Sequence, residues 1–239
     1  MPEFLELKKE LKSMASPKKV KLLQGFFKTG RGEYGEGDIF LGVIVPELRK
    51  IAGKYAGLKM EEVIRLLRSK IHEERLAALL IMVDKFQTGK EQKRIYDLYL
   101  KNTKYINNWD LVDMSAHKIV GAHLLRKPFD SAQGKNFSIL IKLARSRNFW
   151  ERRVAVLATF YFIRNNEFSE AVKIAEMLLN DGHDLIQKAV GWMLREVGKR
   201  DLKVEEKFLK KYYKKMPRTM LRYAIEKFPE RKRRKYLKN

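Results

Sequence analysis

Residues 72–86 have the sequence HEERLAALLIMVDKF, and this stretch decides the fold class. Its apolar residues recur at three- and four-residue spacing, which is the period of an α-helix and not the alternation of a strand. The same spacing continues along most of the chain, in residues 61–68, 90–100, 109–125, 137–146, 150–164, 168–180, 185–199, 204–213 and 218–227. Short breaks rich in Gly, Pro and Asn separate these segments. The pattern therefore predicts an all-α protein.

A weak internal repeat accompanies the helical pattern. A basic residue followed by small and apolar residues recurs in 74–78, 152–156 and 187–191, and we interpret these segments as the second helices of successive helical pairs. The predicted helices are mostly about 10–17 residues long, and helices joined by short turns pack antiparallel to their neighbours. The repeat favours an α-solenoid of stacked HEAT-like pairs, forming a single domain over residues 1–239 with a basic C-terminal tail at 231–239. We expect it to curve and to present a basic concave face.

Residues 29–45 depart from the helical pattern. The Gly-rich stretch 29–38 is predicted to be a loop, and its glycines lack the spacing of a phosphate-binding loop. Residues 39–45 look extended and are followed by Pro46, a residue that suits the first position of a helix.

The composition restricts the partner and the chemistry. Lys and Arg outnumber Asp and Glu by 52 to 29, which gives a net charge of +23. Such an excess predicts a polyanionic partner, either nucleic acid or an anionic membrane, although a generally Lys-rich surface would have the same composition. Because there is no cysteine, disulfides, thiolate metal sites and a Cys nucleophile are excluded. We see no signal peptide or membrane-spanning apolar run, and we expect a cytoplasmic protein.

Three segments place a tryptophan close to Asp or Arg on an expected helix. In 107–113, Trp109 and Asp113 are four residues apart and share a helix face, with Asn108 as a candidate N-cap. The second segment is 148–153, and in the third Trp192 lies three residues before Arg195. Spacing alone favours a purely structural role, in which the tryptophans are core residues and the charged residues form local caps or ion pairs.

Five segments together resemble the AlkD family of HEAT-like-repeat DNA glycosylases. They are residues 40–49 with the sequence FLGVIVPELR, 109–113 with WDLVD, 150–153 with WERR, 188–196 with KAVGWMLRE and 217–225 with PRTMLRYAI. The resemblance covers most of the chain, and its motifs occur in the family's order. It implies an enzyme that excises N3- and N7-alkylated purines from duplex DNA and acts as a monomer. Because the sequence singles out no lysine for a Schiff base with the opened sugar, we expect a monofunctional glycosylase, cytoplasmic and nucleoid-associated when on DNA.

The resemblance also implies a role for each matching residue. Asp113 would stabilise the sugar cation and position the attacking water, and Trp109 and Trp192 would flank the cationic nucleotide. Arg153 and Arg195 would contact phosphates. The other residues that we expect to contact DNA are Phe27, Arg152, Lys188 and Arg222. The family often has Tyr near the position of Phe27, so a hydrogen bond from that hydroxyl is missing here.

Other signals add little. His72, His117, His123 and His183 show no metal-ligand spacing, so we expect no metal and no cofactor. Asp113 and His117, four residues apart, suit a local ion pair better than a general acid/base pair. Two alternatives to a glycosylase remain: a non-catalytic HEAT-like protein that binds damaged or branched DNA, and a scaffold that binds proteins.

Overall fold

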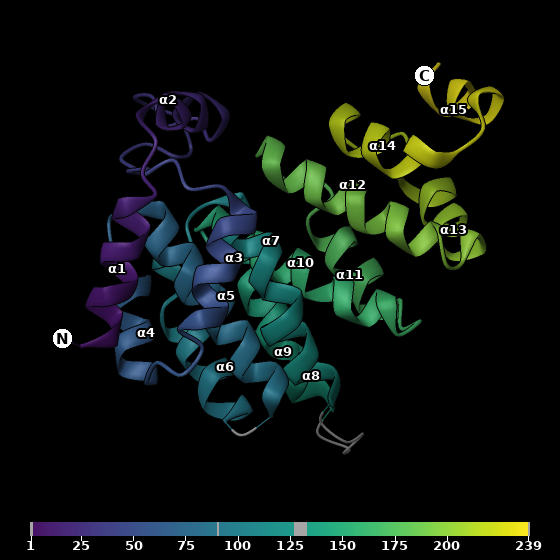
Figure 1. The fold of residues 1–239 in the computed structure, drawn as a ribbon. Helices are drawn as coiled ribbons and strands as arrows, with labels where there is room; N and C mark the ends of the chain where they lie inside the picture. The colour runs from purple at the N-terminus through teal and green to yellow at the C-terminus, as the bar shows by residue number, and fades with distance from the viewer. Residues whose placement is uncertain (1, 90, 127–132, 239) are drawn as a thin grey trace. The chain divides into compact units, whose positions relative to one another are not determined.

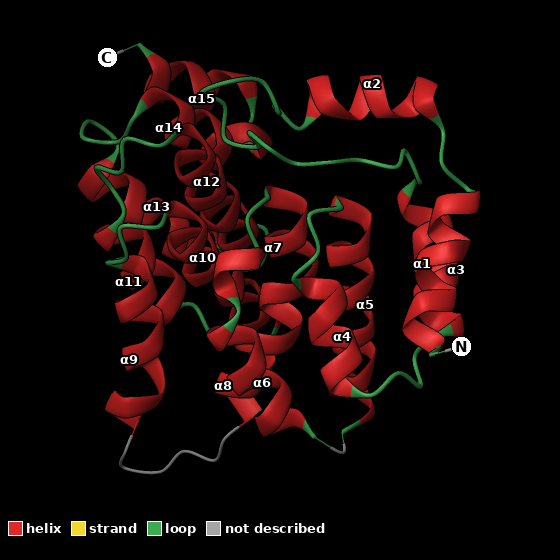
Figure 2. Cartoon of the chain, turned by 90° about the vertical axis from the view of Figure 1, so that its left-hand side faces the viewer, coloured by secondary structure: helices red, strands yellow, loops and turns green. Residues whose placement is uncertain are grey.

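The computed structural model describes residues 2–89, 91–126 and 133–238, with the backbone alone at 133–136. Helices dominate these ranges, and their only pairing of the β type is one isolated parallel bridge between Ile39 and Ile71. The prediction of an all-α fold is therefore confirmed (Figures 1 and 2). Among the described helices, none combines the length and the apolar character needed to cross a membrane. The chain divides into two compact units, Met1–Ser115 and Ala116–Asn239.

The first unit is organised around α5 (His72–Thr88). Helices α3 (Val45–Lys54), α4 (Met60–Leu67) and α6 (Gln92–Lys101) pack against it, together with α1 (Glu3–Ser13). The short helix η1 (Thr103–Tyr105) and α7 (Trp109–Ala116) complete the unit after α6. Helix α5 is buried on most of its circumference, including its charged first turn, because neighbouring helices cover several of its faces.

Helix α2 (Pro17–Phe26) differs from the other helices of this unit in that none of its residues is buried. Pro17 occupies the start of the helix, where its missing N–H costs no hydrogen bond. Leu22 and Phe26 are 67% and 63% exposed. The connection from α2 to α3 runs through the expected loop at 29–38 and an extended stretch that ends where α3 begins at Val45.

The second unit contains the π-helix η2 (His117–Gly121), α8 (Ala122–Arg126), α9 (Gln133–Ala144), α10 (Phe149–Arg164), α11 (Ser169–Met177), α12 (Asp184–Gly198), α13 (Leu202–Tyr212), α14 (Arg218–Ala224), η3 (Ile225–Lys227) and α15 (Glu230–Leu237). Helix α10 packs against α9, α11, α12 and η2, and α12 in turn packs against α13 and α14. Each of these two long helices therefore contacts several neighbouring helices of the unit. Residues 231–237, expected to be a tail, belong to helix α15.

Two glycines mark equivalent close contacts between helices of this unit. Gly121 and Gly191 each end a Lys-x-Val-Gly sequence, at 118–121 and 188–191. A Cβ at Gly121 would lie 2.2 Å from the Ala158 carbonyl oxygen of α10, and one at Gly191 would lie 2.4 Å from the Met220 carbonyl oxygen of α14. Backbone atoms cannot retreat as the end of a side chain can. Glycine is therefore required for these helices to approach each other so closely.

We expect Gly191→Ala to destabilise the protein by about 1–3 kcal/mol, because the added methyl group overlaps the backbone of α14. The measurement is the free energy of unfolding from urea denaturation. Gly53→Ala is the matched control, since a Cβ at this position in α3 would meet no atom within 4 Å. The control should be neutral or more stable by up to about 1 kcal/mol. Equal effects of the two substitutions would contradict the proposed close contact.

Candidate active site

Trp109, the first residue of α7, is half-buried at one end of a stack of rings in the first unit. Its ring lies nearly parallel to that of Phe27, with centroids 5.0 Å apart and 13° between the planes. Phe27 in turn stacks on Phe40 at 5.0 Å, and Phe40 stacks on His72 at 4.5 Å. The exposed ring of Phe26 meets Trp109 edge-on at 5.5 Å. The two rings that contact the indole therefore come from one segment, and Phe40 and His72 from two other segments support Phe27 from its far side.

The stack rests on a buried network of charged side chains. The Nδ1 atom of His72 lies 3.0 Å from Asp38, and its Nε2 atom lies 2.8 Å from Asp110. Arg75 forms a salt bridge with Asp38, and the Asn108 amide donates a hydrogen bond to the same carboxylate at 3.0 Å. All five side chains are almost completely shielded from solvent. Such burial requires that charges be paired, as they are here.

The protonation of this network follows from its contacts. Burial alone would lower the pKa of His72, but the charge and hydrogen bond of Asp110, joined by those of Asp38, outweigh it and raise the pKa to about 9. Burial opposes ionisation of Asp38 as well, yet the hydrogen bond from His72 and the charge of Arg75 hold its pKa below the usual value. His72 is therefore an imidazolium at neutral pH, with a carboxylate on each ring nitrogen. Since Asp110 directly follows Trp109, the network anchors the start of α7.

A third buried carboxylate, after Asp38 and Asp110, positions Phe40 within the stack. Glu73 accepts hydrogen bonds from the backbone N–H groups of Leu41, Gly42 and Val43, at 2.8–3.2 Å. Gly42 has a φ of +86°, and a Cβ there would lie 2.5 Å from the Ser16 carbonyl oxygen. Only glycine fits both constraints without strain. The Phe-Leu-Gly sequence is thus a backbone arch fastened to the first turn of α5.

Asp113 lies one helical turn after Trp109 on α7 and is half-buried. Beneath it, the hydroxyl groups of Tyr99 and Ser115 are hydrogen-bonded at 2.9 Å. Burial raises the pKa of Tyr99 well above its ordinary value. The hydrogen bond with Ser115 opposes this rise, and the nearby negative charge of Asp113 adds to it. The Asp113 carboxylate therefore sits at the boundary between solvent and a neutral, hydrogen-bonded phenol.

In the second unit, Trp192 is half-buried in the middle of α12. Its indole N–H donates a hydrogen bond to Glu196 at 3.1 Å, and its ring lies 5.9 Å from that of Phe160. Arg195 forms a salt bridge with Glu226, and its Nε atom lies 3.7 Å from the Glu196 carboxylate. The carboxylates of α12 and η3 therefore hold both residues in place.

The remaining predicted DNA-binding residues differ in exposure. Arg153 is only 5% exposed and donates a hydrogen bond to the Leu185 carbonyl at 2.6 Å. Arg152 bridges Asp181, at 2.7 Å, and the carbonyl of Ser146. These two arginines tie α10 to the start of α12. By contrast, Arg222 of α14 is exposed. The side chain of Lys188 in α12 is 38% exposed and forms a salt bridge with Asp184 at 2.6 Å.

Comparison with known proteins identifies the family. The family model described as "DNA alkylation repair enzyme" matches residues 7–228. The chain belongs to this family. A solved structure of a predicted DNA alkylation repair enzyme from Enterococcus faecalis superimposes with a TM-score of 0.66, covering 90% of this chain and 97% of that one at 16% identity. At such low identity the likeness concerns the fold alone. No curated protein matches the sequence.

As a member of the DNA alkylation repair family, the protein acts in DNA repair, and DNA is its partner. The structure brings Phe27, Trp109 and Asp113 into one unit and places Arg152, Arg153, Lys188, Trp192, Arg195 and Arg222 in the other. The convergence of these two sets on one basic concave surface remains a prediction.

Sequence reasoning missed the ion network of this family member. It linked Asp38 and Asp110 to no partner, and it considered His72 only as a metal ligand. One signal was present: residues 72–75 are four consecutive polar residues that open an otherwise apolar helix. Polar side chains at buried positions indicate partners elsewhere in the chain.

Proposed function

We propose that this protein is a monofunctional DNA glycosylase that hydrolyses the N-glycosidic bond of cationic N3- and N7-alkylated purines in duplex DNA. One observation carries the proposal. A half-buried carboxylate, Asp113, lies one helical turn from a half-buried indole, Trp109, whose orientation is held by the ring stack and the ion network. Preorganised charge of this kind is what the reaction requires.

The chemistry starts from a leaving group that is already activated. Alkylation at N3 or N7 gives the purine a positive charge, so the base departs neutral and needs no protonation. The sugar that remains carries the positive charge in an oxocarbenium-like transition state, as in glycoside hydrolysis. Asp113 stabilises that charge and orients a water molecule. The water oxygen bonds to C1′, and its proton is lost to the carboxylate or to solvent.

The aromatic residues recognise charge and not sequence. Indole rings attract cations through their electron-rich faces. Trp109 provides such a ring in the first unit, and we propose that Trp192 provides the second. Because Phe27 is 7% exposed and stacked under Trp109, we propose that it supports this ring and does not itself touch DNA.

In the proposed complex, some cationic residues contact phosphates and others hold the helices in place. Arg222 and Lys188 are the accessible candidates for phosphate contacts, and Arg195 would join them by exchanging Glu226 for a phosphate oxygen. Arg152 and Arg153 act mainly by fixing the start of α12, since their guanidinium groups are already held by protein oxygens. We propose that the protein acts as a monomer without a cofactor.

Release of methylated purines from duplex DNA treated with a methylating agent tests the proposal. The purified protein should liberate free N3-methyladenine or N7-methylguanine and leave abasic sites without cutting the strand, as detected by chromatography and by later alkaline cleavage. Binding should weaken steeply with added salt, because phosphate contacts release counterions. Binding without base release on any alkylated substrate would instead favour a non-catalytic protein that recognises damaged or branched DNA. Binding that resists salt would favour a protein scaffold.

A further inference from the structure

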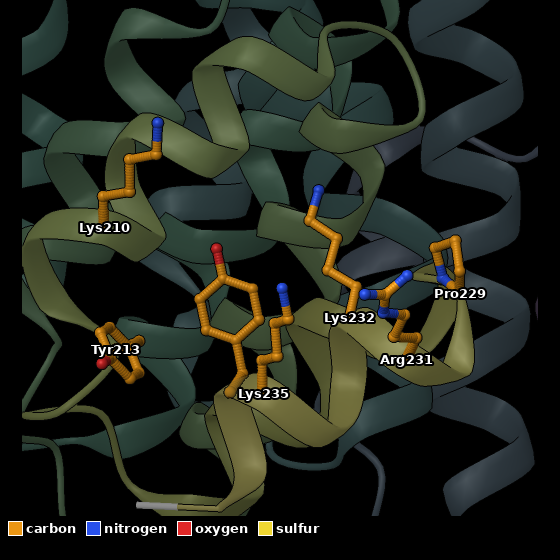
Figure 3. A pocket seen from close by; sticks show the side chains of 7 residues that line it. Lys210, Tyr213, Pro229, Arg231, Lys232 and Lys235 are labelled. Atoms are coloured by element: carbon orange, nitrogen blue, oxygen red, sulfur yellow. The ribbon is translucent and has the colours of Figure 1, made fainter.

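A hollow of about 690 Å³ lies between α13 and α15 in the second unit, apart from every residue assigned to the glycosylase reaction. Figure 3 shows labelled cationic side chains from both helices around it, Lys210 from α13 and Arg231, Lys232 and Lys235 from α15. The other lining residues are Tyr213, Pro229 and Tyr236. We call this hollow the α13–α15 pocket. Its volume lies within the range of about 300–1,000 Å³ that is typical of small-molecule sites.

The cations of this pocket are unequally compensated. Lys232 forms a salt bridge with Glu206 and lies 4.4 Å from the centre of the Phe228 ring. Lys210, Arg231 and Lys235 are exposed, and among the residues that the structure describes none of the three has a carboxylate in salt-bridge contact. The pocket therefore carries a local excess of positive charge that an anionic group would neutralise.

The acidic groups nearby do not remove this excess. Glu230 at the start of α15 is held by Arg233 and Arg234 of the same helix. Glu205 is 2% exposed, and burial outweighs the nearby Lys232 charge to raise the pKa of this carboxyl to about 8. Glu205 is therefore largely uncharged at neutral pH.

Aromatic rings form the apolar part of the pocket. Tyr213 and Tyr236 meet edge-to-face, with centroids 5.3 Å apart, and Tyr236 also lies 5.9 Å from Phe228. Both tyrosines are half-buried, so part of each ring remains accessible. Burial holds the pKa of Tyr236 above its ordinary value, and its phenol is neutral at physiological pH. A neutral aromatic wall thus adjoins three cations that form no salt bridge with a described carboxylate.

We infer that the α13–α15 pocket binds an unpaired nucleotide of single-stranded DNA. The base stacks on the accessible face of Tyr236 or Tyr213, and the phosphates flanking it contact Lys210, Arg231 and Lys235. A planar group joined to an anion is what the two halves of the pocket complement, and this combination is the usual one for single-strand binding. In an intact duplex the base faces are covered by their neighbours, so the same pocket would reach phosphates only. The inference rests on DNA as the partner and does not depend on glycosylase chemistry.

Photocrosslinking tests the site directly. The full-length protein is irradiated with an oligothymidylate of about ten nucleotides that carries one 5-iodouracil, a length within the range bound by single-strand sites. We expect mass spectrometry to find the crosslink on Tyr236 or Tyr213. Crosslinks found only outside the α13–α15 pocket would overturn the inference.

Binding of the same oligonucleotide, measured by fluorescence anisotropy, provides the second readout. The double substitution Lys210→Gln/Lys235→Gln should weaken binding about tenfold and reduce the salt slope by about 1.4, since each lost phosphate contact on a single strand removes about 0.7. Tyr236→Ala should weaken binding about 5- to 150-fold, the range for loss of one stacked base, and Tyr236→Phe should leave it unchanged. The charge-matched control is Lys9→Gln/Lys12→Gln, which changes two exposed lysines of α1.

The outcomes separate this inference from the proposed function. The pocket variants should lose single-strand affinity and still release methylated bases from duplex DNA. A protein that shows no glycosylase activity yet gives the Tyr236 crosslink would disprove the proposed function only. If the control double variant weakens binding as much as Lys210→Gln/Lys235→Gln, the binding is general charge attraction and the inference is wrong. Because Tyr236→Ala could disturb the packing on Phe228, the lysine variants decide the matter where this variant unfolds.

Discussion

Asp113→Asn is expected to slow the release of alkylated purines by about 100- to 1,000-fold, the size of effect seen when one preorganised electrostatic group is lost. Asparagine retains the shape of the carboxylate and can still hold a water molecule, but it carries no charge to stabilise a sugar cation. Single-turnover release from methylated duplex DNA measures the effect. Affinity for undamaged duplex DNA should stay within about threefold, because in the proposed complex the residue acts on the sugar and holds no phosphate.

Two comparisons make this result specific. Asp97→Asn removes an exposed carboxylate from α6 in the same unit, where it pairs with Lys93, and should release bases at the wild-type rate. The free energy of unfolding of Asp113→Asn should be close to that of the wild type, since Asp113 is only half-buried. Undiminished base release by Asp113→Asn would remove this carboxylate from the mechanism.

His72→Leu is expected to lower the free energy of unfolding by about 3–5 kcal/mol at neutral pH, because it leaves the buried Asp110 carboxylate without its cation. Asp38 would keep Arg75 and Asn108, so the loss falls mainly on the start of α7. Base release should fall as well, since Trp109 loses the anchor beneath its stack. Urea denaturation at pH 7 measures the stability.

The same substitution should alter the pH dependence of stability. The folded-state pKa of His72, about 9, exceeds the ordinary value of 6.5 expected in the unfolded chain. Its contribution is therefore fully present below pH 6.5 and is lost as the pH rises through 9, a change of about 3 kcal/mol. Glu205 also destabilises the wild type as the pH rises, but it does so equally in the variant. The difference between the two proteins should therefore shrink between pH 6.5 and 9.

His183→Asn serves as the control for both measurements. His183 caps α12, and asparagine is a good residue for that position, so the loss of stability should be limited to about 0.5–1.5 kcal/mol, from the ring that stacks on Phe149. The pKa of His183 is lowered by burial, so this loss should not change with pH between 6.5 and 9. A constant stability difference between wild type and His72→Leu across this pH range would show that His72 is not charged in the folded protein.

The long helices could be predicted from the sequence because their apolar residues recur at the helical period, on one face in α12 and over most of the circumference in α5. Residues 72–86 and 185–199 match α5 and α12 closely, since neighbouring helices contact the same residues that set the period. Helix α2 was missed for the same physical reason. It buries none of its residues, so no stripe had to be present in its sequence.

The parts of the site that depend on distant pairing could not be predicted in this way. His72 meets Asp38 and Asp110 across 34 and 38 residues of chain, and no local pattern encodes such a separation. Phe27 was expected to contact DNA because the family often has Tyr near this position. Its burial depends on Phe40 and Trp109, which reach it from other segments. The shared helix face of Trp109 and Asp113 could be predicted because a single helical turn fixes the distance between them, whereas their assignment to the site came from the family resemblance.

The ion network beneath Trp109 also affects how a positively charged protein can accept a positively charged nucleotide. The chain carries a net charge of +23, which attracts DNA over a long range but would repel a cationic base at short range. His72 and Arg75 contribute two positive charges to the network, and Asp38 and Asp110 contribute two negative ones, so their sum is zero. In the proposed complex, the net charge of the protein would attract the duplex, while the potential at the damaged base would be set by this neutral network. Asp113 would make that local potential negative.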